Sequence, residues 1–306
     1  MKVLILGSKG LVGSSLKTIL GKNENIQELI CSTRSDTDLF DFNETKKLIQ
    51  NNRPDVLINA AAKVGGIYAN NSKRTEFILE NLKINLNILE ASIPFSNMYI
   101  INLGSSCIYP LNADNPISEN SIMTGKLEPT NSPYAMAKLT GIEIGNSLTQ
   151  QYGHKVLNLM PTNLYGPNDR FNEEDSHVIP GLIIRMHKAM ENNLKEFNIW
   201  GTGKPLREFL YIDDLALALE FLIFNQPSES LLNIGSGEEI SIYNLAKKLK
   251  NIIGFDGELV IDESMPDGNP RKLLDSRKIN KMGWKPTVDI DKGLESTYNW
   301  YKENIK

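Results

Sequence analysis

One stretch decides the fold: Met1-Lys2-Val3-Leu4-Ile5-Leu6-Gly7-Ser8-Lys9-Gly10-Leu11-Val12-Gly13. The apolar run Val3–Leu6 is typical of a buried parallel strand. Gly7, Gly10 and Gly13 follow it with the spacing Gly-x-x-Gly-x-x-Gly. Glycines at such a turn let the backbone approach a pyrophosphate that sits on the N-terminus of the next helix. The stretch therefore predicts a strand, a dinucleotide-binding turn and a helix from about Leu11.

Strands and helices alternate over the first half of the chain. Apolar runs predict strands at Val3–Leu6, Leu29–Thr33, Val56–Asn59, Tyr99–Leu103 and Lys155–Met160, and a long helix is expected at Arg74–Ser92. This alternation indicates an α/β fold with a doubly wound parallel sheet of the Rossmann type, covered by helices on both faces. We expect a dinucleotide-binding domain at 1–165, to which a segment at roughly 205–235 returns. A smaller C-terminal α/β lobe at 166–306 would bind the substrate.

Composition narrows the class of protein. The 306 residues carry a net charge of −4, which provides no basic field for nucleic acid or an anionic membrane. No apolar stretch reaches the length of a membrane span. Two cysteines, Cys31 and Cys107, are too few for a disulfide framework and suit a reducing cytoplasm. The three histidines form no cluster with metal-ligand spacing, so we expect no metal.

The most informative chemical pattern is the pair Tyr134 and Lys138. Residues four apart lie on one face of a helix, so the ammonium group is expected near the phenol. A nearby cation is expected to lower the tyrosine pKa, which makes Tyr134 a proton donor or acceptor for a carbonyl or alcohol oxygen. Ser105 follows a predicted strand about thirty residues earlier and would hydrogen-bond the same substrate oxygen. Together with the glycine turn, these residues favour a reductase.

Two basic residues bear on the choice of cofactor. Arg34 follows the second predicted strand, where an acidic residue would hold the ribose 2′-hydroxyl of NAD and an arginine accommodates a 2′-phosphate. Lys9 adds a second cation from the glycine turn. The pair favours NADP(H). Ala61 and Ala62 after the third strand are small enough for the cofactor to approach closely.

Several longer segments carry a family resemblance. With the glycine turn and Tyr-x-x-x-Lys, the chain resembles the extended short-chain dehydrogenases/reductases and, from end to end, the GDP-L-fucose synthase family. The segments that carry this likeness are Ala61–Ile67, Gly104–Pro110, Leu127–Asn131, Met160–Pro167, Ser176–Pro180, Trp200–Gly203, Arg207–Leu210 and Pro266–Asp275.

The resemblance implies a bifunctional enzyme that uses NADP(H). It would epimerise a GDP-4-keto-6-deoxy-mannose at C3 and C5, and then reduce the ketone at C4. Ser105, Tyr134 and Lys138 would act in reduction, while Cys107 and His177 match the family's epimerisation pair. The residues that the resemblance assigns to the cofactor are Gly7, Lys9, Gly10, Leu11, Val12, Gly13, Arg34, Asp41, Ala61, Ala62 and Lys138, with Asp41 reaching toward the adenine.

The GDP-sugar is expected mainly in the C-terminal part. Arg185, Arg207 and Lys272 are cations suited to a diphosphate, although Arg185 fits a solvated helix face equally well. Trp200 would border the guanine or fill the core, and the core is slightly favoured. Ser106 and Asn163 complete the predicted substrate contacts. Relatives pair the Tyr134 helix and the Arg74–Ser92 helix across a two-fold axis, so a homodimer is expected.

The sequence is compatible with three functional hypotheses, of which the bifunctional enzyme is the first. Position 9 is lysine where the family more often has arginine, and position 8 is serine where histidine is common. The acidic segment Asp169–Asp175 precedes His177, and if it displaces that histidine the enzyme would only reduce C4. The alternatives are therefore a C4 reductase of another GDP-4-keto sugar, such as a GDP-4-keto-6-deoxy-heptose, without epimerisation, and more remotely a non-catalytic NADP-sensing protein.

Overall fold

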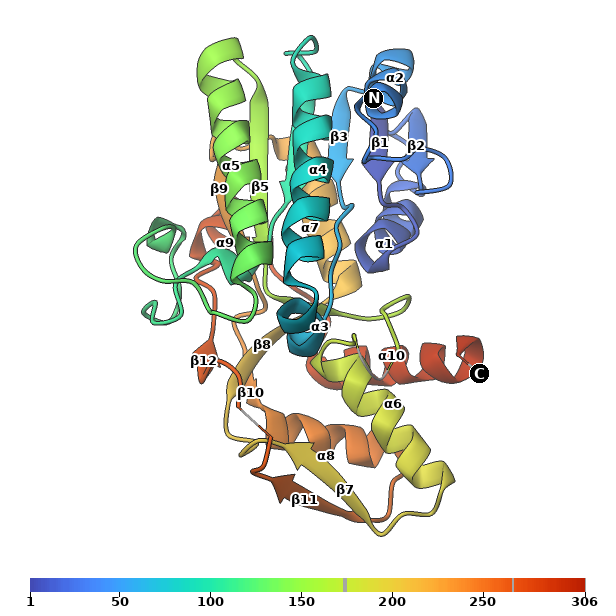
Figure 1. Cartoon of the computed structure of the whole chain (residues 1–306). Helices are drawn as coiled ribbons and strands as arrows, with labels where there is room; N and C mark the ends of the chain where they lie inside the picture. The colour runs from blue at the N-terminus through green and yellow to red at the C-terminus, as the bar shows by residue number, and fades with distance from the viewer. Residues whose placement is uncertain (173–174, 266, 306) are drawn as a thin grey trace.

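The large lobe is built on a parallel sheet. The computed structural model describes residues 1–172, 175–265 and 267–305. Six strands lie in the order β2-β1-β3-β4-β5-β9, and all neighbours are parallel, which confirms the predicted sheet (Figure 1). Their bounds are β1 (Lys2–Leu6), β2 (Glu28–Ser32), β3 (Val56–Asn59), β4 (Tyr99–Leu103), β5 (Lys155–Pro161) and β9 (Leu231–Ile234).

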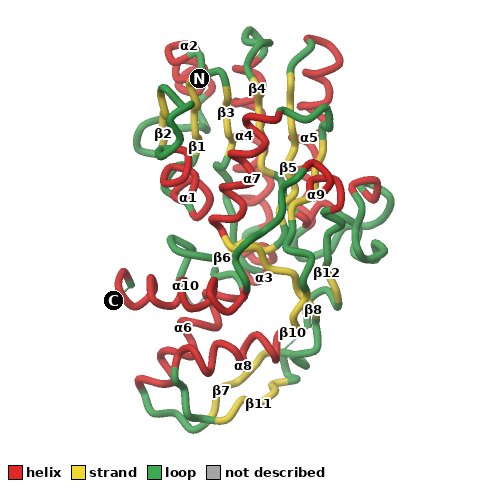
Figure 2. Tube along the Cα trace, turned by 180° about the vertical axis from the view of Figure 1, so that it is seen from behind, coloured by secondary structure: helices red, strands yellow, loops and turns green. Residues whose placement is uncertain are grey.

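Helices cover both faces of this sheet, as expected. Along β1, Val3 and Ile5 pack into the core beneath one layer of helices, whereas Leu4 and Leu6 pack beneath the other. Because both faces are covered, the strand is apolar throughout rather than alternating. The first layer holds α1 (Leu11–Leu20) and α7 (Ile212–Asn225), and the second holds α2 (Phe42–Asn52), α4 (Arg74–Ser92) and α5 (Ser132–Tyr152) (Figures 1 and 2).

The strand order reverses between β1 and β3. The chain runs from β1 to β2 on one side and then crosses back to β3 on the other side. In open parallel sheets, ligands bind beyond the carboxyl ends of the strands at such a reversal. Gly7 follows β1 here, and Ala61 lies close to it after β3. The topology thus places the predicted cofactor turn at the ligand-binding edge.

A row of buried asparagines crosses the face beneath α4 and α5. Asn59, Asn102 and Asn158 are paired in register on β3, β4 and β5. Asn59 Nδ2 donates to Asn102 Oδ1 at 2.9 Å, and Asn102 Nδ2 donates to Asn158 Oδ1 at 3.2 Å. Asn59 Nδ2 also donates to Asn85 Oδ1 of α4 at 3.2 Å. Gly141 of α5 lies against this row, where a Cβ atom would come within 2.9 Å of the Asn85 amide, so α5 can pack closely.

The small lobe lies beyond the carboxyl ends of the large sheet (Figure 1). Its core is a separate cluster of aliphatic and aromatic side chains. β8, which falls inside the segment expected to return to the large lobe, belongs instead to a small sheet with β6, β10 and β12. The lobe comprises β6 (Asn163–Tyr165), α6 (Val178–Glu191), β7 (Glu196–Trp200), β8 (Leu206–Tyr211), β10 (Glu239–Ser241), α8 (Ile242–Ile253), β11 (Glu258–Asp262), β12 (Arg271–Lys272) and α10 (Ile290–Asn304).

Three later segments pack against the large sheet. They are α7, β9 and α9 (Arg277–Met282), whose apolar side chains join the core of the large lobe. Short elements frame the junction between the lobes, namely α3 (Ile67–Ser72) and the 3-10 turns η1 (Ser106–Ile108) and η2 (Glu119–Ser121). Within the described ranges, none of the helices is both long enough and apolar enough to cross a membrane.

Candidate active site

Ser105, Cys107, Tyr134 and Lys138 are brought together where β4 ends and α5 begins. Ser105 caps the turn η1, and its Oγ accepts a hydrogen bond of 3.2 Å from the backbone N–H of Cys107. Pro133 lies in the first turn of α5, a position that proline favours because it needs no N–H partner there. Tyr134 therefore lies in the first turn of α5, and Lys138 follows one turn later on the same face.

Lys138 is buried beneath Tyr134. Its side chain is 3% exposed, and its Nζ donates a hydrogen bond of 2.8 Å to the carbonyl oxygen of Leu103. Nζ lies 5.7 Å from the centre of the Tyr134 ring. Removal from water penalises the charged form, which lowers the pKa of Lys138 to about 8. The lysine therefore titrates close to physiological pH.

Tyr134 keeps its proton in this structure. Burial raises the pKa of the phenol, the nearby Cys107 raises it further, and a hydrogen bond with Ser105 lowers it. The expectation that Lys138 lowers the pKa of Tyr134 is wrong here, because desolvation of the phenol dominates and the Lys138 Nζ is directed to Leu103. The phenol is thus set up as a proton donor to an oxygen that develops negative charge.

His177 reaches the same region from the small lobe. It is the N-cap residue of α6 but makes no capping hydrogen bond with its side chain, and its imidazole hydrogen-bonds the backbone of Gly65. Gly65 lies against Phe77, whose ring meets that of Tyr134 edge-on at 6.3 Å. Cys107 packs against the small cluster formed by these two rings and Ala69. Residue 177 is open to solvent on one side, but surrounding protein and the Arg170 guanidinium lower the pKa of its imidazole.

The segment before His177 is tied to the loop after β3. The N–H of Gly66 donates to the carbonyl oxygen of Asp175 at 2.9 Å. The Asp175 carboxylate also lies 3.6 Å from Lys73 and 3.7 Å from Arg170. These contacts fix the approach of His177 to the site. Of the acidic segment predicted to move this histidine, Glu173 and Glu174 lie outside the described residues, as does Pro266 of the matched segment Pro266–Asp275.

The glycine turn fits a dinucleotide pyrophosphate. Gly7 has φ +79°, a conformation that side chains disfavour, and a Cβ there would lie 2.8 Å from Ala61 Cα. A Cβ at Gly13 would lie 2.3 Å from the Gly7 carbonyl oxygen. The close packing leaves the N-terminus of α1 open for an anion, with Lys9 and Gly10 exposed there, and Leu11 and Val12 begin the helix.

Basic and acidic side chains lie together at the outer end of the predicted cofactor site. Arg34 stacks on Phe40, with its Cζ 5.1 Å from the ring centre. Asp36 lies near Lys9, and its carboxylate accepts hydrogen bonds from Thr33, which lower its pKa. Asp41 was expected to reach toward the adenine. Its side chain instead caps α2 by accepting from the Glu44 N–H at 2.9 Å, and an adenine contact stays a prediction.

Two of the three predicted diphosphate ligands are neighbours in the structure, Arg207 on β8 and Lys272 on β12, whereas Arg185 lies on α6. Arg207 Nη1 donates to the Leu206 carbonyl oxygen at 2.8 Å, and burial lowers its pKa despite the opposing effect of Asp267. Lys272 lies beside it on β12, in register with Arg207, and its Nζ is 3.8 Å from the Sγ of Cys107. Asn163 donates from Nδ2 to the Glu208 carbonyl oxygen at 2.8 Å.

Trp200 and Arg185 form a stacked pair. The Arg185 Cζ lies 4.1 Å from the ring centre of Trp200 and 5.1 Å from that of Phe197. Trp200 is 49% exposed, so the favoured expectation that it fills the core is wrong. The stacked guanidinium also donates to the Asn198 carbonyl oxygen at 3.3 Å. Its contact with substrate remains a prediction, as does that of Ser106, which is 3% exposed.

One site residue was not singled out from the sequence. Asn131 precedes α5, and its Nδ2 lies 3.6 Å from the Sγ of Cys107. Its position at the end of Leu127–Asn131 was a signal of family likeness, but the spacing of 24 residues to Cys107 gives no pattern. Only the folded chain brings the two together.

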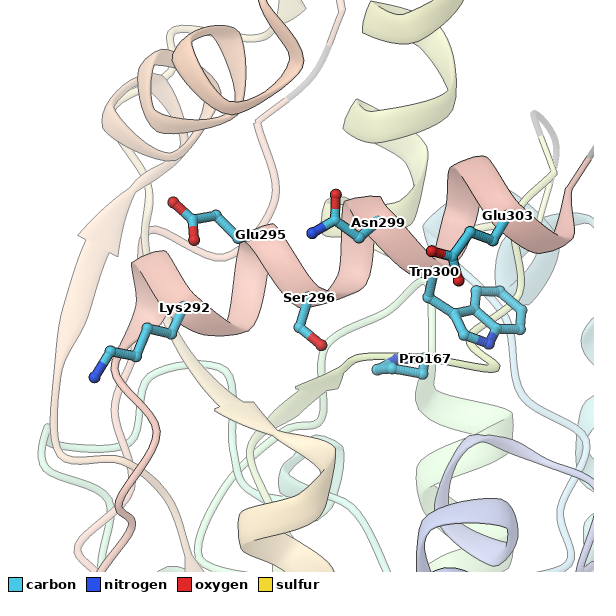
Figure 3. Close-up of a pocket in the computed structure, with 7 residues that line it drawn as sticks. All are labelled: Pro167, Lys292, Glu295, Ser296, Asn299, Trp300 and Glu303. Carbon is cyan, nitrogen blue, oxygen red and sulfur yellow. The ribbon is translucent and has the colours of Figure 1, made fainter.

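A surface hollow of about 550 Å³ lies apart from these residues, along α10 (Figure 3). None of the predicted site residues lines it, so it does not belong to the candidate catalytic site. Its lining is Pro167, Lys292, Glu295, Ser296, Asn299, Trp300 and Glu303. Across the described residues, no group of three His, Cys, Asp or Glu side chains is arranged to hold a metal ion.

Comparison with known proteins places the chain in a family. Residues 3–235 match the model of the NAD dependent epimerase/dehydratase family. The chain is 45% identical to "Probable GDP-L-fucose synthase 1" of Oryza sativa subsp. japonica, over 99% of this chain and 93% of that protein.

Two solved structures are similar over nearly their whole length. A GDP-L-fucose synthetase from Naegleria fowleri bound to NADP is 32% identical, with a TM-score of 0.89 over 99% of this chain and 94% of that one. A GDP-6-OMe-4-keto-L-xylo-heptose reductase from C. jejuni is 31% identical, with a TM-score of 0.91 over 99% and 97%. The resemblance drawn from the motifs is thereby confirmed: the chain belongs to the NAD dependent epimerase/dehydratase family and, within it, to the GDP-L-fucose synthases.

Proposed function

We propose that the chain is an NADP-dependent epimerase and reductase that converts a GDP-4-keto-6-deoxy-mannose to GDP-L-fucose. The observation that carries the proposal is that two groups of reactive side chains lie around the Phe77 and Tyr134 rings. Ser105, Tyr134 and Lys138 suit reduction, while Cys107 and His177 suit epimerisation. A plain reductase has no need of the second set.

For reduction, the chain's own residues supply the proton and hold the ketone. The Ser105 hydroxyl and the Tyr134 phenol hydrogen-bond the C4 oxygen, and Tyr134 transfers its proton to that oxygen as it becomes an alkoxide. The Lys138 ammonium stabilises the phenolate that this transfer leaves behind. Bound NADPH supplies the hydride to C4. The resulting phenolate is reprotonated from solvent.

For epimerisation, the C4 ketone acidifies the C–H bonds at C3 and C5. The Cys107 thiolate removes a proton, so the C–H bond breaks, an S–H bond forms and the electron pair moves to an enolate on the C4 oxygen. Tyr134 and Ser105 hydrogen-bond that oxygen. His177 then delivers a proton to the opposite face of the carbon, and it must first take up that proton in surroundings that lower its pKa. Exchange with solvent resets both side chains before the second carbon reacts.

NADP(H) is the cofactor that suits the predicted binding edge. The glycine turn carries the pyrophosphate at the N-terminus of α1, and Arg34 with Lys9 provides the cations for a 2′-phosphate. The NADP-bound relative from Naegleria fowleri supports this assignment. We propose that 1–165, together with the returning α7 and β9, is mainly the cofactor part and 166–306 mainly the GDP-sugar part, although β6 within the first range already pairs with β8 of the small sheet.

The deciding experiment is turnover of GDP-4-keto-6-deoxy-mannose with NADPH in D2O, with the product read by NMR. Deuterium at both C3 and C5, together with the galacto configuration, supports the proposal. Reduction at C4 without deuterium overturns the epimerase half. The Cys107→Ser and His177→Asn variants should then still consume NADPH with a substrate epimerised beforehand.

The second candidate is a C4 reductase of a longer GDP-4-keto sugar, such as a 6-deoxy-heptose. The likeness to the C. jejuni heptose reductase favours it, although the identity is lower than to the fucose synthase of rice. One added carbon changes binding by only about 1–3 kcal/mol, so both sugars must be compared directly. Faster turnover of the heptose, without deuterium, would select this alternative.

We further propose a homodimer formed by α4 and α5, in a cytoplasmic enzyme. The outer faces of these helices expose Leu79, Leu86 and Met136, each between 43% and 50%. A hollow of about 330 Å³ between the helices is lined by Arg74, Thr75, Ile78, Ser132, Pro133 and Met136. Sedimentation should give twice the mass of 34.3 kDa, and Leu86→Asp should halve it. The free thiols Cys31 and Cys107 fit a reducing compartment.

A further inference from the structure

The Cys107 thiol lies between two nitrogen donors from different parts of the chain. The amide Nδ2 of Asn131 is 3.6 Å from Sγ, and the ammonium Nζ of Lys272 is 3.8 Å from it. An ammonium group has donors and no acceptor, so the sulfur must be the acceptor in the second contact. The thiol is therefore placed as the recipient of two hydrogen bonds, one of them from a cation.

The surroundings of Lys272 leave its charge available to the sulfur. The lysine lies on β12 and is only partly exposed. Throughout the described part of the chain, no carboxylate forms an ion pair with it. By contrast, its neighbour Arg271 is paired with Glu239 at 2.6 Å. The two residues of β12 thus differ, one neutralised at the surface and the other directed to Cys107.

The N-terminus of α5 also favours negative charge at the Cys107 sulfur. Asn131 is the N-cap residue of α5, so Cys107 lies near the N-terminal end of a helix of 21 residues. That end carries partial positive charge from the aligned peptide dipoles. Cations and helix N-termini both favour the thiolate form of cysteine. Asn131, Lys272 and α5 therefore all stabilise negative charge on one sulfur atom.

We propose that Lys272 and Asn131 are positioning residues that hold the Cys107 sulfur by two hydrogen bonds in the orientation in which it removes the substrate proton. Lys272 thereby acts on epimerisation rather than on the diphosphate to which the sequence assigned it. The inference rests on the proposed function, because the proton that Cys107 removes comes from C3 or C5 of the substrate. Since Cys107 is in the large lobe and Lys272 in the small lobe, the contact that positions the sulfur spans the two lobes.

The first test measures the free enzyme, so it does not depend on the substrate. The alkylation rate of Cys107 by iodoacetamide at pH 7 is followed by mass spectrometry of the peptide, with Cys31 of β2 as the internal reference thiol. Lys272→Met should slow alkylation of Cys107 about tenfold, while Lys272→Arg keeps most of it. Asn131→Asp should also slow it, because a carboxylate then faces the sulfur. The control Lys285→Met, an exposed lysine, should change neither thiol.

The second test separates positioning from diphosphate binding. With Lys272→Met, deuterium incorporation into the keto sugar should fall about tenfold at saturating substrate, with little change in the Kd of GDP. An unchanged alkylation rate together with a weakened Kd for GDP would overturn the inference and restore Lys272 as a diphosphate ligand. If the wild-type enzyme turns over no GDP-4-keto-6-deoxy-mannose, the proposed function fails, but the alkylation result still decides the role of Lys272.

Discussion

The ammonium of Lys138 donates a hydrogen bond of 2.8 Å to the carbonyl oxygen of Leu103, the last residue of β4. Because burial lowers the pKa of Lys138 to about 8, the group loses its proton as pH rises through that value. The rate of C4 reduction should therefore fall above about pH 8. A pH profile of kcat, followed through NADPH absorbance, checks this. The Lys138→Arg variant stays charged, so its kcat should be lower than that of the wild type but independent of pH over this range. A wild-type kcat that does not change from pH 7 to 9.5 would contradict the assignment.

Removing the Tyr134 hydroxyl should abolish reduction. Tyr134→Phe keeps the ring packed against Phe77 but deletes the proton donor, so kcat should fall by about 10²–10⁴. Binding of NADPH, measured by fluorescence titration, should change little. Tyr243→Phe, on the exposed side of α8, serves as the control. A variant that retains more than a tenth of wild-type kcat would exclude Tyr134 as the acid.

Arg34 should determine the preference for NADPH over NADH. Arg34→Ala removes a charged hydrogen-bond donor for the 2′-phosphate, so the Kd of NADPH should rise about tenfold or more, while that of NADH stays the same. Lys46→Met, an exposed cation of α2, controls for the general loss of positive charge. Equal losses for both dinucleotides would mean that Arg34 acts on structure rather than on the phosphate.

A methyl group at Gly66 should separate the two activities. A Cβ there would lie 2.5 Å from the carbonyl oxygen of Ser176, so Gly66→Ala must displace the segment that leads to His177. Deuterium incorporation should fall at least about tenfold, whereas reduction of a previously epimerised keto sugar should persist. Gly181→Ala is the matched control, because its Cβ would meet Ser176 Cβ at an ordinary 3.7 Å. Parallel loss of both activities would refute this separation.

Asp169 should make the stability of the protein depend on pH. Burial raises the pKa of its carboxyl from 3.8 to about 7, and its Oδ2 has no partner within the described residues. The folded state thus holds a proton that the unfolded chain releases, and the unfolding free energy declines as pH rises from about 4 to about 7.

Replacing that carboxyl should remove the dependence. Asp169→Asn should be more stable than the wild type at pH 8, by up to about 4 kcal/mol, and similar to it at pH 4. Urea unfolding at both pH values measures the difference. Asp256→Asn, at an exposed aspartate, should show no such gain. Equal stabilities of Asp169→Asn and wild type at pH 8 would mean that the carboxyl is solvated.

The sequence predicted those features that depend on local pattern. Apolar runs located Val56–Asn59 and Tyr99–Leu103, and helical spacing located Arg74–Ser92, with the bounds that the structure has. The short helix α3 was not predicted, because six residues are too few to show helical periodicity. Features set by distant contacts were also missed: Lys272 meets Cys107 across 165 residues of chain.

The pKa of Tyr134 is another feature that depends on distant contacts. Its helix spacing to Lys138 is local, and the two do lie near each other. The depth of burial, however, depends on how α5 packs against the rest of the molecule, and burial dominates the titration of the phenol. A motif can therefore give the partners of an acid–base group without giving its protonation state.

The asparagine row also constrains how the chain can fold. A shift of one residue between β3 and β4 would turn Asn59 or Asn102 toward the opposite, apolar layer of helices. Each amide left there without a partner would cost about 1–3 kcal/mol. Misaligned sheets are therefore penalised while the strands assemble, and the same amides that lie beneath α5 in the finished protein act during folding as a check on strand alignment.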